Sequence, residues 1–185
     1  MQTIVFETGQ VPIALVDLAA RQWGADITAF KLADAKAIIL FEDDFTPICV
    51  TVFDSFTACG VVQASGAVFD EKKALSRAFL KKLYEQVFDV WKVNRMNFFT
   101  DVSNQKMLNM HERLGHVFEG TLSEHYGVGK DGAVYRFNRR DWEASIWHPQ
   151  ARTRRQQQWE VPQRQIPIHM ASLPAKQHLI PLPTT

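Results

Sequence analysis

The sequence predicts a mixed α/β domain, α+β in character, in which helices flank one mostly antiparallel sheet. Segments with apolar residues at helical spacing alternate with short runs rich in β-branched and aromatic residues. Three of those runs follow one another with only short turns between them, which favours antiparallel neighbours because parallel strands need a long crossover. With 185 residues, 46% of them hydrophobic, the chain can form one domain with a core of its own.

The amino-terminal half is expected to begin with a strand over Gln2–Glu7 and a helix over Val11–Trp23. The helix should stop at Gly24, since glycine commonly ends helices. Three strands bounded by turn residues follow, at Ala35–Phe41, Ile48–Phe53 and Ala58–Ala64. We expect these three strands to form an antiparallel meander.

The longest predicted helix is Lys73–Phe88. Its apolar residues recur every four positions, at Leu75, Phe79, Leu83 and Val87. Asp70 and Glu71 precede it, where carboxylates stabilise the positive end of the helix dipole. The remaining predicted elements are a strand, a helix and two strands, at Arg95–Val102, Gln105–Leu114, Val117–Tyr126 and Ala133–Asn138.

The composition changes after His148, which predicts a boundary between a domain over residues 1–148 and a tail over residues 149–185. The tail is rich in proline and glutamine, and its five basic residues face a single acid, Glu160. Such a segment cannot bury a core of its own, so we expect it to be extended. We therefore expect residues 149–185 to bind a protein partner or a second copy of the chain.

The overall composition gives no indication of a nucleic-acid or membrane partner. The formal net charge is +1, and no apolar run approaches the roughly 20 residues of a membrane-spanning helix. The start of the chain lacks the basic-then-apolar pattern of a secretory signal. Cys49 and Cys59 are expected to be reduced, as in a cytoplasmic protein, and the alternative is a disulfide between adjacent strands. No zinc-ligand, Ser-His-Asp or Walker spacing appears, so no metal site is predicted.

The run Asn104–Gly120, NQKMLNMHERLGHVFEG, and the later RRDW at Arg139–Trp142 carry a family resemblance. Together with the order of the predicted elements, they resemble the GNAT acetyltransferases. The resemblance is greatest to the branch that acetylates amino termini of ribosomal proteins and to its phage-encoded relatives. It covers roughly Val11 to Trp142. It implies the GNAT acyl-CoA N-acyltransferase fold, acetyl-CoA as cofactor, and transfer of an acetyl group to an amine.

Two residues of this run are expected at helix ends. The Asn104 side chain can accept a hydrogen bond from a free backbone N–H of the helix that begins at Gln105. Gly115 stands where a helix ends in a left-handed residue, a conformation that glycine adopts without strain. The resemblance also implies that Asn104 lies near the pantetheine arm of the cofactor, which makes Asn104 a candidate cofactor-binding residue.

His111 is a candidate general acid. The family often has a tyrosine four residues before the corner glycine, where it protonates the departing thiolate, and His111 stands at that position. An imidazole can donate a proton near neutral pH. The alternative is a structural histidine on the apolar face of its helix, bonded to a backbone carbonyl. His116 replaces the usual phenylalanine, which predicts a corner that is partly exposed or covers a polar group.

The segment before the long helix is the predicted cofactor loop. In the family, a glycine-rich turn lets backbone N–H groups approach the pyrophosphate. The matching segment is Gly66–Arg77, GAVFDEKKALSR, whose two small positions fall on Lys72 and Ala74. In one interpretation, cationic side chains replace part of the glycine cradle, and the cofactor-binding residues are Lys72, Lys73, Ala74, Ser76 and Arg77. In the other, the loop has lost this role and its basic residues form a solvated helix start.

Glu119, which matches the family's glutamate–glycine strand, and Glu124 are candidate bases for the acceptor amine. Two main functions remain open, and a third option is that the basic tail contacts nucleic acid. One is an acetyl-CoA-dependent N-acetyltransferase in the cytoplasm with an unknown acceptor. The other is a catalytically inactive GNAT-fold structural or interaction protein. For the second we expect a phage virion component, located in a host cytoplasm or a virion, that docks through residues 149–185.

Overall fold

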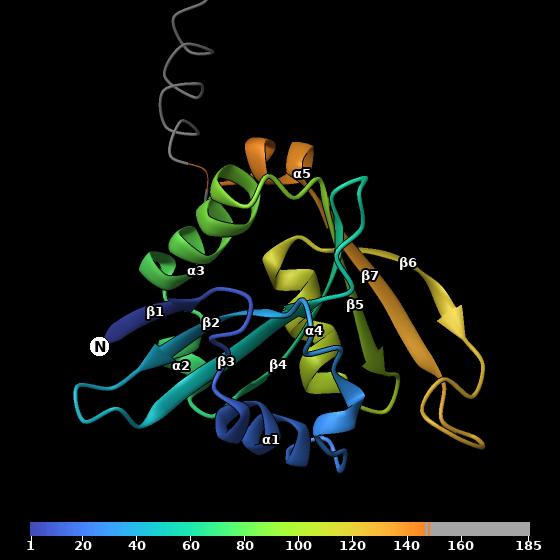
Figure 1. The fold of residues 1–185 in the computed structure, drawn as a ribbon. Coiled ribbons are helices and arrows are strands. Elements are labelled where there is room, and N and C mark those ends of the chain that lie inside the picture. The colour runs from blue at the N-terminus through green and yellow to red at the C-terminus, as the bar shows by residue number, and fades with distance from the viewer. Residues whose placement is uncertain (147, 149–185) are drawn as a thin grey trace, which may run out of the picture.

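A computed structural model describes residues 1–146 and 148 (Figure 1). Its elements in chain order are β1 (Gln2–Phe6), α1 (Ile13–Arg21), the 3-10 turn η1 (Ile27–Ala29), β2 (Lys36–Phe41), β3 (Pro47–Asp54), β4 (Val61–Val68), α2 (Glu71–Ala74), α3 (Arg77–Tyr84), the π-helical segment η2 (Glu85–Val90), β5 (Arg95–Asp101), α4 (Gln105–Leu114), β6 (Val117–Leu122), β7 (Gly132–Asn138) and α5 (Arg139–Ala144). The predicted tail over residues 149–185, and with it the predicted boundary, lies outside the described residues.

The strands form one seven-stranded mixed sheet in the order β1-β2-β3-β4-β5-β7-β6. Neighbours are antiparallel except for β4 and β5, which are parallel. The predicted meander is present as β2-β3-β4, and β1 extends it at its outer edge. The parallel contact covers only three residue pairs, from Val61–Arg95 to Gln63–Asn97. The sheet therefore consists of two antiparallel parts joined by a short parallel contact.

Helices cover both faces of the larger part of the sheet. On one face α1 packs its buried residues Val16, Ala19 and Ala20 against β3 and β4. On the opposite face α3 and η2 pack with residues of α4 and α5 in a second core. Figure 1 shows α1 and α3 on opposite sides of the strands.

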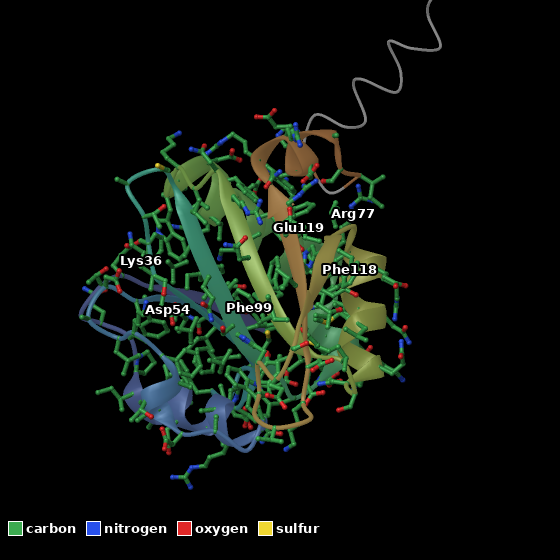
Figure 2. The ribbon with its side chains drawn as sticks, turned by 90° about the vertical axis from the view of Figure 1, so that its right-hand side faces the viewer. Lys36, Asp54, Arg77, Phe99, Phe118 and Glu119 are labelled. Carbon is green, nitrogen blue, oxygen red and sulfur yellow. The ribbon has the colours of Figure 1, made fainter. Side chains whose placement is uncertain are left out.

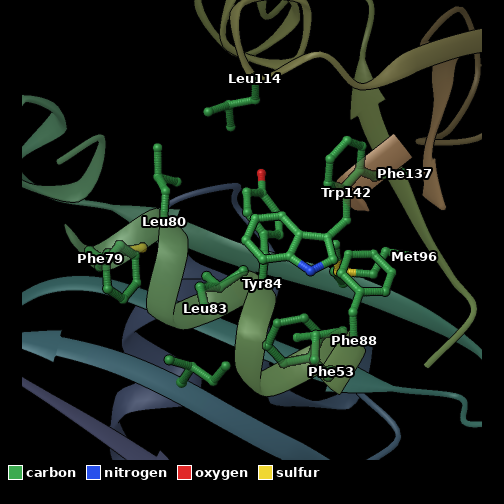
Figure 3. Close-up of a cluster of buried hydrophobic side chains, with 14 of the residues drawn as sticks. Phe53, Phe79, Leu80, Leu83, Tyr84, Phe88, Met96, Leu114, Phe137 and Trp142 are labelled. Carbon is green, nitrogen blue, oxygen red and sulfur yellow. The ribbon is translucent and has the colours of Figure 1, made fainter. Parts of the chain in front are cut away.

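The second core centres on Trp142 of α5, which is fully buried. Its ring centroid lies 6.5 Å from that of Phe88 and 5.6 Å from that of Tyr84. The Tyr84 ring in turn lies 5.0 Å from that of Phe137 in β7 (Figure 3). Because aromatic side chains bury large apolar areas, these contacts tie α3, η2 and α5 firmly to the smaller part of the sheet.

The prediction of one continuous helix over Lys73–Phe88 is wrong, because the structure divides this range into α2, α3 and η2. Ser76 interrupts it with an extended backbone, at φ −62° and ψ 138°, and its hydroxyl accepts the N–H of Phe79 at 3.4 Å. Serine favours such a cap because its side chain competes with the helix for backbone hydrogen bonds. The apolar spacing across the break stays nearly helical, so periodicity alone does not reveal it.

Two further expectations need correction. β4 runs over Val61–Val68 rather than Ala58–Ala64, because Gly60 has a left-handed φ of 74° and belongs to the preceding turn. The first residues of the predicted cofactor loop therefore lie in a strand. The short helix α5 was not predicted, and at its start Asp141 accepts the N–H of Asn138 at 3.0 Å.

Gly66 in β4 supports a first testable prediction. A Cβ atom at this position would lie 2.2 Å from the carbonyl oxygen of Val50 in β3, which is backbone and cannot move aside cheaply. We expect Gly66→Ala to lower the free energy of unfolding by about 2 kcal/mol or more. The control Ser65→Ala changes the adjacent residue and should change it by less than about 1 kcal/mol. Chemical denaturation measures both, and a Gly66→Ala protein as stable as the wild type would contradict the close approach.

Candidate functional site

β4 and β5 separate after their shared residue pairs (Figure 1), and we call the stretch in which their facing edges are unpaired the opening. The last pair joins Gln63 to Asn97, whereas β4 continues to Val68 and β5 to Asp101. In the part of the chain that the structure describes, no other strand pairs with these facing edges. Backbone N–H and C=O groups need partners. Unpaired strand edges of this kind are the places where extended ligands form main-chain hydrogen bonds with proteins.

Trp23, which follows α1, lies against this opening. Its indole N–H donates a hydrogen bond to the carbonyl oxygen of Gly66 at 3.0 Å, within the unpaired stretch of β4. The residue remains 44% exposed, and its ring lies 5.4 Å from that of Phe30. Trp23 thus forms part of the wall on the α1 side.

The segment that follows β4 holds the predicted cofactor residues, and Lys73 is already paired there. Its ammonium group contacts the carboxylate of Glu42 and lies 3.4 Å from that of Asp70. The bond to Glu42 raises the pKa of Lys73. The Asp70 carboxylate also accepts the N–H of Lys73 at 3.2 Å, and this backbone bond lowers the pKa of Asp70. Lys73 and Asp70 therefore brace the start of α2.

Three other predicted residues of this segment have partners in the fold. Ala74 is buried in the core. Ser76 caps α3, as described above. The guanidinium group of Arg77 donates to the carbonyl oxygen of Ile146 at 3.0 Å, which ties the start of α3 to the residues after α5. These three side chains therefore form contacts that stabilise the fold.

Lys72 differs from its neighbours because its side chain is exposed and forms no ion pair with any described residue. It lines a surface hollow together with Glu71, Leu75 and Arg113. The hollow lies between α2 and α4. Of the predicted basic residues, Lys72 has the ammonium group that is freest to meet a ligand.

Asn104 and Gly115 hold the predicted positions at the ends of α4. The Asn104 side-chain oxygen accepts the N–H of Met107 at 3.1 Å, and Gly115 adopts a left-handed φ of 80°. These two structural predictions are confirmed. The predicted contact of Asn104 with a pantetheine arm stays a prediction.

His111 is buried in a chain of four hydrogen-bonded side chains. Its Nε2 lies 2.9 Å from the Thr100 hydroxyl and its Nδ1 lies 2.7 Å from Nδ1 of His116. The Nε2 of His116 lies 3.0 Å from the Tyr84 hydroxyl. His116 thus covers a polar group, one of the two outcomes expected for that corner. For His111 the geometry supports the structural alternative, with a hydroxyl and a second imidazole in place of the expected backbone carbonyl.

One direction of this chain satisfies the buried Tyr84. If Tyr84 donates to Nε2 of His116, then His116 donates from Nδ1 to Nδ1 of His111, and His111 donates from Nε2 to Thr100. In the reverse direction the hydroxyl hydrogen of Tyr84 would have no acceptor among the described residues. Burial lowers the pKa of His111 to about 4, and burial with the nearby His111 lowers the pKa of His116 well below its usual value. Both rings are therefore neutral near pH 7.

Glu119 lies in β6 (Figure 2), and its carboxylate pairs with two arginines. Its carboxylate lies 2.9 Å from Nε of Arg136 and also contacts the guanidinium group of Arg95. Arg136 in turn lies 2.6 Å from the carboxylate of Asp141. The Glu119 carboxylate is thus part of an ion-pair network that joins three strands of the sheet to the start of α5. The second candidate base, Glu124, is exposed, and its carboxylate accepts the N–H of Gly129 at 3.4 Å.

Two residues of α4 that the sequence did not single out face the cofactor segment. Nζ of Lys106 lies 3.1 Å from the carboxylate of Glu71, and Nη1 of Arg113 lies 3.9 Å from it. Lys106 and Arg113 are seven residues apart, so two helical turns place them on one face. That spacing is visible in the sequence, but the identity of the facing helix is not.

The described residues contain neither a membrane-spanning helix nor a group of metal-binding side chains. No helix among residues 1–146 is both long and apolar enough to cross a membrane. No three histidine, cysteine, aspartate or glutamate side chains in that part gather closely enough to hold a metal ion. Cys49 and Cys59 are free, as expected for reduced residues.

A scan against protein-family models and a search of curated proteins found no match. Solved structures do match. A spermidine/spermine N-acetyltransferase SpeG from Vibrio cholerae matches 59% of this chain and 69% of its own, with a TM-score of 0.53 and 14% identity. A ribosomal-protein-S5-alanine acetyltransferase from Vibrio fischeri matches 58% and 63%, with a TM-score of 0.50 and 16% identity. The chain thus has the GNAT fold, as predicted, while nothing in these comparisons supports the expected phage relatives.

The histidine pair predicts a loss of stability in mild acid. The unfolded chain binds a proton on His111 below about pH 6.5, whereas the folded protein binds it only near pH 4. The stability that the neutral ring contributes is therefore complete above pH 6.5 and is lost as the pH falls towards 4. For His111 the free energy of unfolding should decrease by up to about 3 kcal/mol over this window. Urea denaturation at pH 7.5, 6.5, 5.5 and 4.5 measures it.

A double variant, His111→Tyr with His116→Phe, is the control for this window. It removes both titrating rings and fills their space, whereas the carboxylates, which also titrate in acid, remain. The decrease between pH 6.5 and 4.5 should therefore be smaller in the double variant than in the wild type. Equal decreases in the two proteins would show that other groups cause the acid sensitivity.

Proposed function

We propose that the protein is an acetyl-CoA-dependent N-acetyltransferase. The observation that carries the proposal is the opening between β4 and β5 within a GNAT fold. Acetyl-CoA presents an extended arm with amide groups and, at its other end, phosphates. The unpaired strand edges suit the amides. The exposed Lys72 and the cations of α4 suit the phosphates.

The residues that would hold the cofactor lie on both sides of the opening. The edge of β4 beyond Gln63 and the edge of β5 beyond Asn97 would bind the arm, with Trp23 as a wall. Lys72 would bind phosphate at the start of α2. When bound, acetyl-CoA supplies an activated thioester whose carbonyl carbon is attacked by an amine. The chain's own contribution is to align the thioester and to exclude water from it.

The acceptor is proposed to be a primary amine. The structural neighbours are named for spermidine and for the alanine of ribosomal protein S5, which are both amines at the reacting atom. The described residues bury His111 and bind the exposed Glu119 carboxylate to two arginines, so both candidates already have partners in the fold. We infer that the amine is deprotonated by water or by solvent-exposed Glu124.

Isothermal titration with acetyl-CoA tests the cofactor proposal. We expect binding by the full chain, and we expect Lys72→Ala to weaken it by about threefold to tenfold because a charged phosphate contact is lost. Lys81→Ala is the matched control: Lys81 lies in α3 and pairs with Glu85 at the start of η2, and its substitution removes the same charge. A release-of-thiol assay with spermidine and with a peptide that begins with alanine then tests transfer.

The absence of binding at millimolar acetyl-CoA would overturn the proposed function. Binding without thiol release on any amine would overturn catalysis but keep the cofactor site. Equal affinities of Lys72→Ala and Lys81→Ala would remove Lys72 from that site.

A second candidate is an interaction protein that keeps the fold without the chemistry. The observation that favours it is that Lys73, Arg77, His111 and Glu119 each have partners inside the protein. In this case residues 149–185 would bind a protein partner or a second copy of the chain. Their basic, proline-rich composition suits binding in an extended form, which costs little ordering entropy.

Deletion of residues 149–185 separates the two candidates. If the tail joins copies of the chain, light scattering should give a multiple of the 21.2 kDa chain mass for the full protein and a single mass for the truncated one. The truncated protein should still bind acetyl-CoA, since the opening and Lys72 lie in the described domain. An unchanged subunit number after truncation would exclude self-association through the tail.

A further inference from the structure

Glu71 joins α2 to α4 at the edge of the surface hollow. Its two carboxylate oxygens face different cations, Oε2 towards Lys106 and Oε1 towards Arg113. Both cations are well exposed, at 73% and 70%, whereas the Glu71 side chain is 34% exposed. The carboxylate therefore lies inward of the two cationic groups that reach over it.

The charges around this hollow are unequal. Glu42 and Asp70 are both engaged by Lys73. Lys73 is already surrounded by carboxylates, because Asp44 also interacts with it electrostatically. Lys72, Lys106 and Arg113 are then left with one anion, Glu71. Three cationic side chains therefore share one carboxylate, which leaves this part of the surface with a positive net charge.

The Glu71 carboxylate has the chemistry of a stand-in for phosphate. It is a planar anion whose two oxygens face an ammonium and a guanidinium group, and both of these groups also bind phosphate oxygens. A phosphate carries more charge and more acceptor oxygens than a carboxylate. In this site a phosphate can therefore satisfy Lys72, Lys106 and Arg113 together, which Glu71 does not.

We propose that Lys72, Lys106 and Arg113 form a phosphate subsite which Glu71 occupies in the free protein. A ligand phosphate displaces Glu71 and so takes over the link between α2 and α4. Glu71 is then an internal competitor that sets the affinity for the ligand. The identity of that ligand as a coenzyme A derivative rests on the proposed function, whereas the anion site itself does not.

The exposed position of the ion pairs determines the size of the effect. Surface ion pairs contribute little, so Glu71 is displaced at modest cost. We expect Glu71→Gln to tighten binding of acetyl-CoA by about threefold to tenfold. We expect the double variant Lys106→Ala with Arg113→Ala to weaken binding by about tenfold, and we expect the affinity of the wild type to fall as salt is added.

The experiment compares the full-length wild type with Glu71→Gln, the double variant and Glu85→Gln by isothermal titration. Glu85→Gln is the matched control, because it also removes one carboxylate from an exposed ion pair, with Lys81 at 3.7 Å. The titrants are acetyl-CoA, its form without the 3′-phosphate, and inorganic pyrophosphate. If the Glu71→Gln gain disappears with the 3′-dephospho form, the 3′-phosphate is the group bound, and if the gain remains, the pyrophosphate is.

The outcomes distinguish the site from the function. If Glu71→Gln binds every titrant no better than Glu85→Gln does, the phosphate subsite is wrong, even when acetyl-CoA binds. If no protein binds acetyl-CoA but pyrophosphate binds more tightly to Glu71→Gln, the subsite stands and the proposed function fails. Thermal melting by circular dichroism shows whether each variant is folded.

Discussion

The short parallel contact between β4 and β5 is the constraint around which the rest of the structure is built. Three residue pairs join the two parts of the sheet, and beyond them the strands separate. Such a contact gives few hydrogen bonds, so side-chain packing has to hold the parts together. The rings around Trp142 do this, because α3, η2 and α5 contribute to one cluster that also includes Phe137 of β7. The opening can therefore remain free of a third strand while the fold stays intact.

The same constraint explains where polar groups are used. Charged side chains link separate elements: Glu119 links β6 to β5 and β7, and Arg77 links α3 to the residues after α5. The four-residue chain from Thr100 to Tyr84 joins β5 to α3 through two imidazoles. Polar groups buried in this way stabilise only if every member has a partner. The side chains that most resemble catalytic groups are thus held by the fold.

The sequence predicted the strands and most helices in their order along the chain, because apolar periodicity and turn residues are local signals. It also predicted the roles of Asn104 and Gly115, since both positions depend on one helix alone. It failed where a local signal competed with another: Ser76 caps a new helix inside a continuous apolar stripe, and Gly60 delays the start of β4. The sequence could not predict the hydrogen-bond partners of His111. Thr100 and His116 lie next to its ring only because the sheet and α4 pack together.

The two acids of the predicted cofactor segment, Asp70 and Glu71, carry the same charge but differ in their contacts. In the sequence Asp70 and Glu71 look alike, and both oppose a phosphate. In the structure Asp70 accepts the N–H of Lys73 and so builds the start of α2. Glu71 has no such backbone bond among the described residues and meets only the cations of α4. The charge of Asp70 therefore belongs to the helix, whereas that of Glu71 can be exchanged for a ligand's without unfolding the segment.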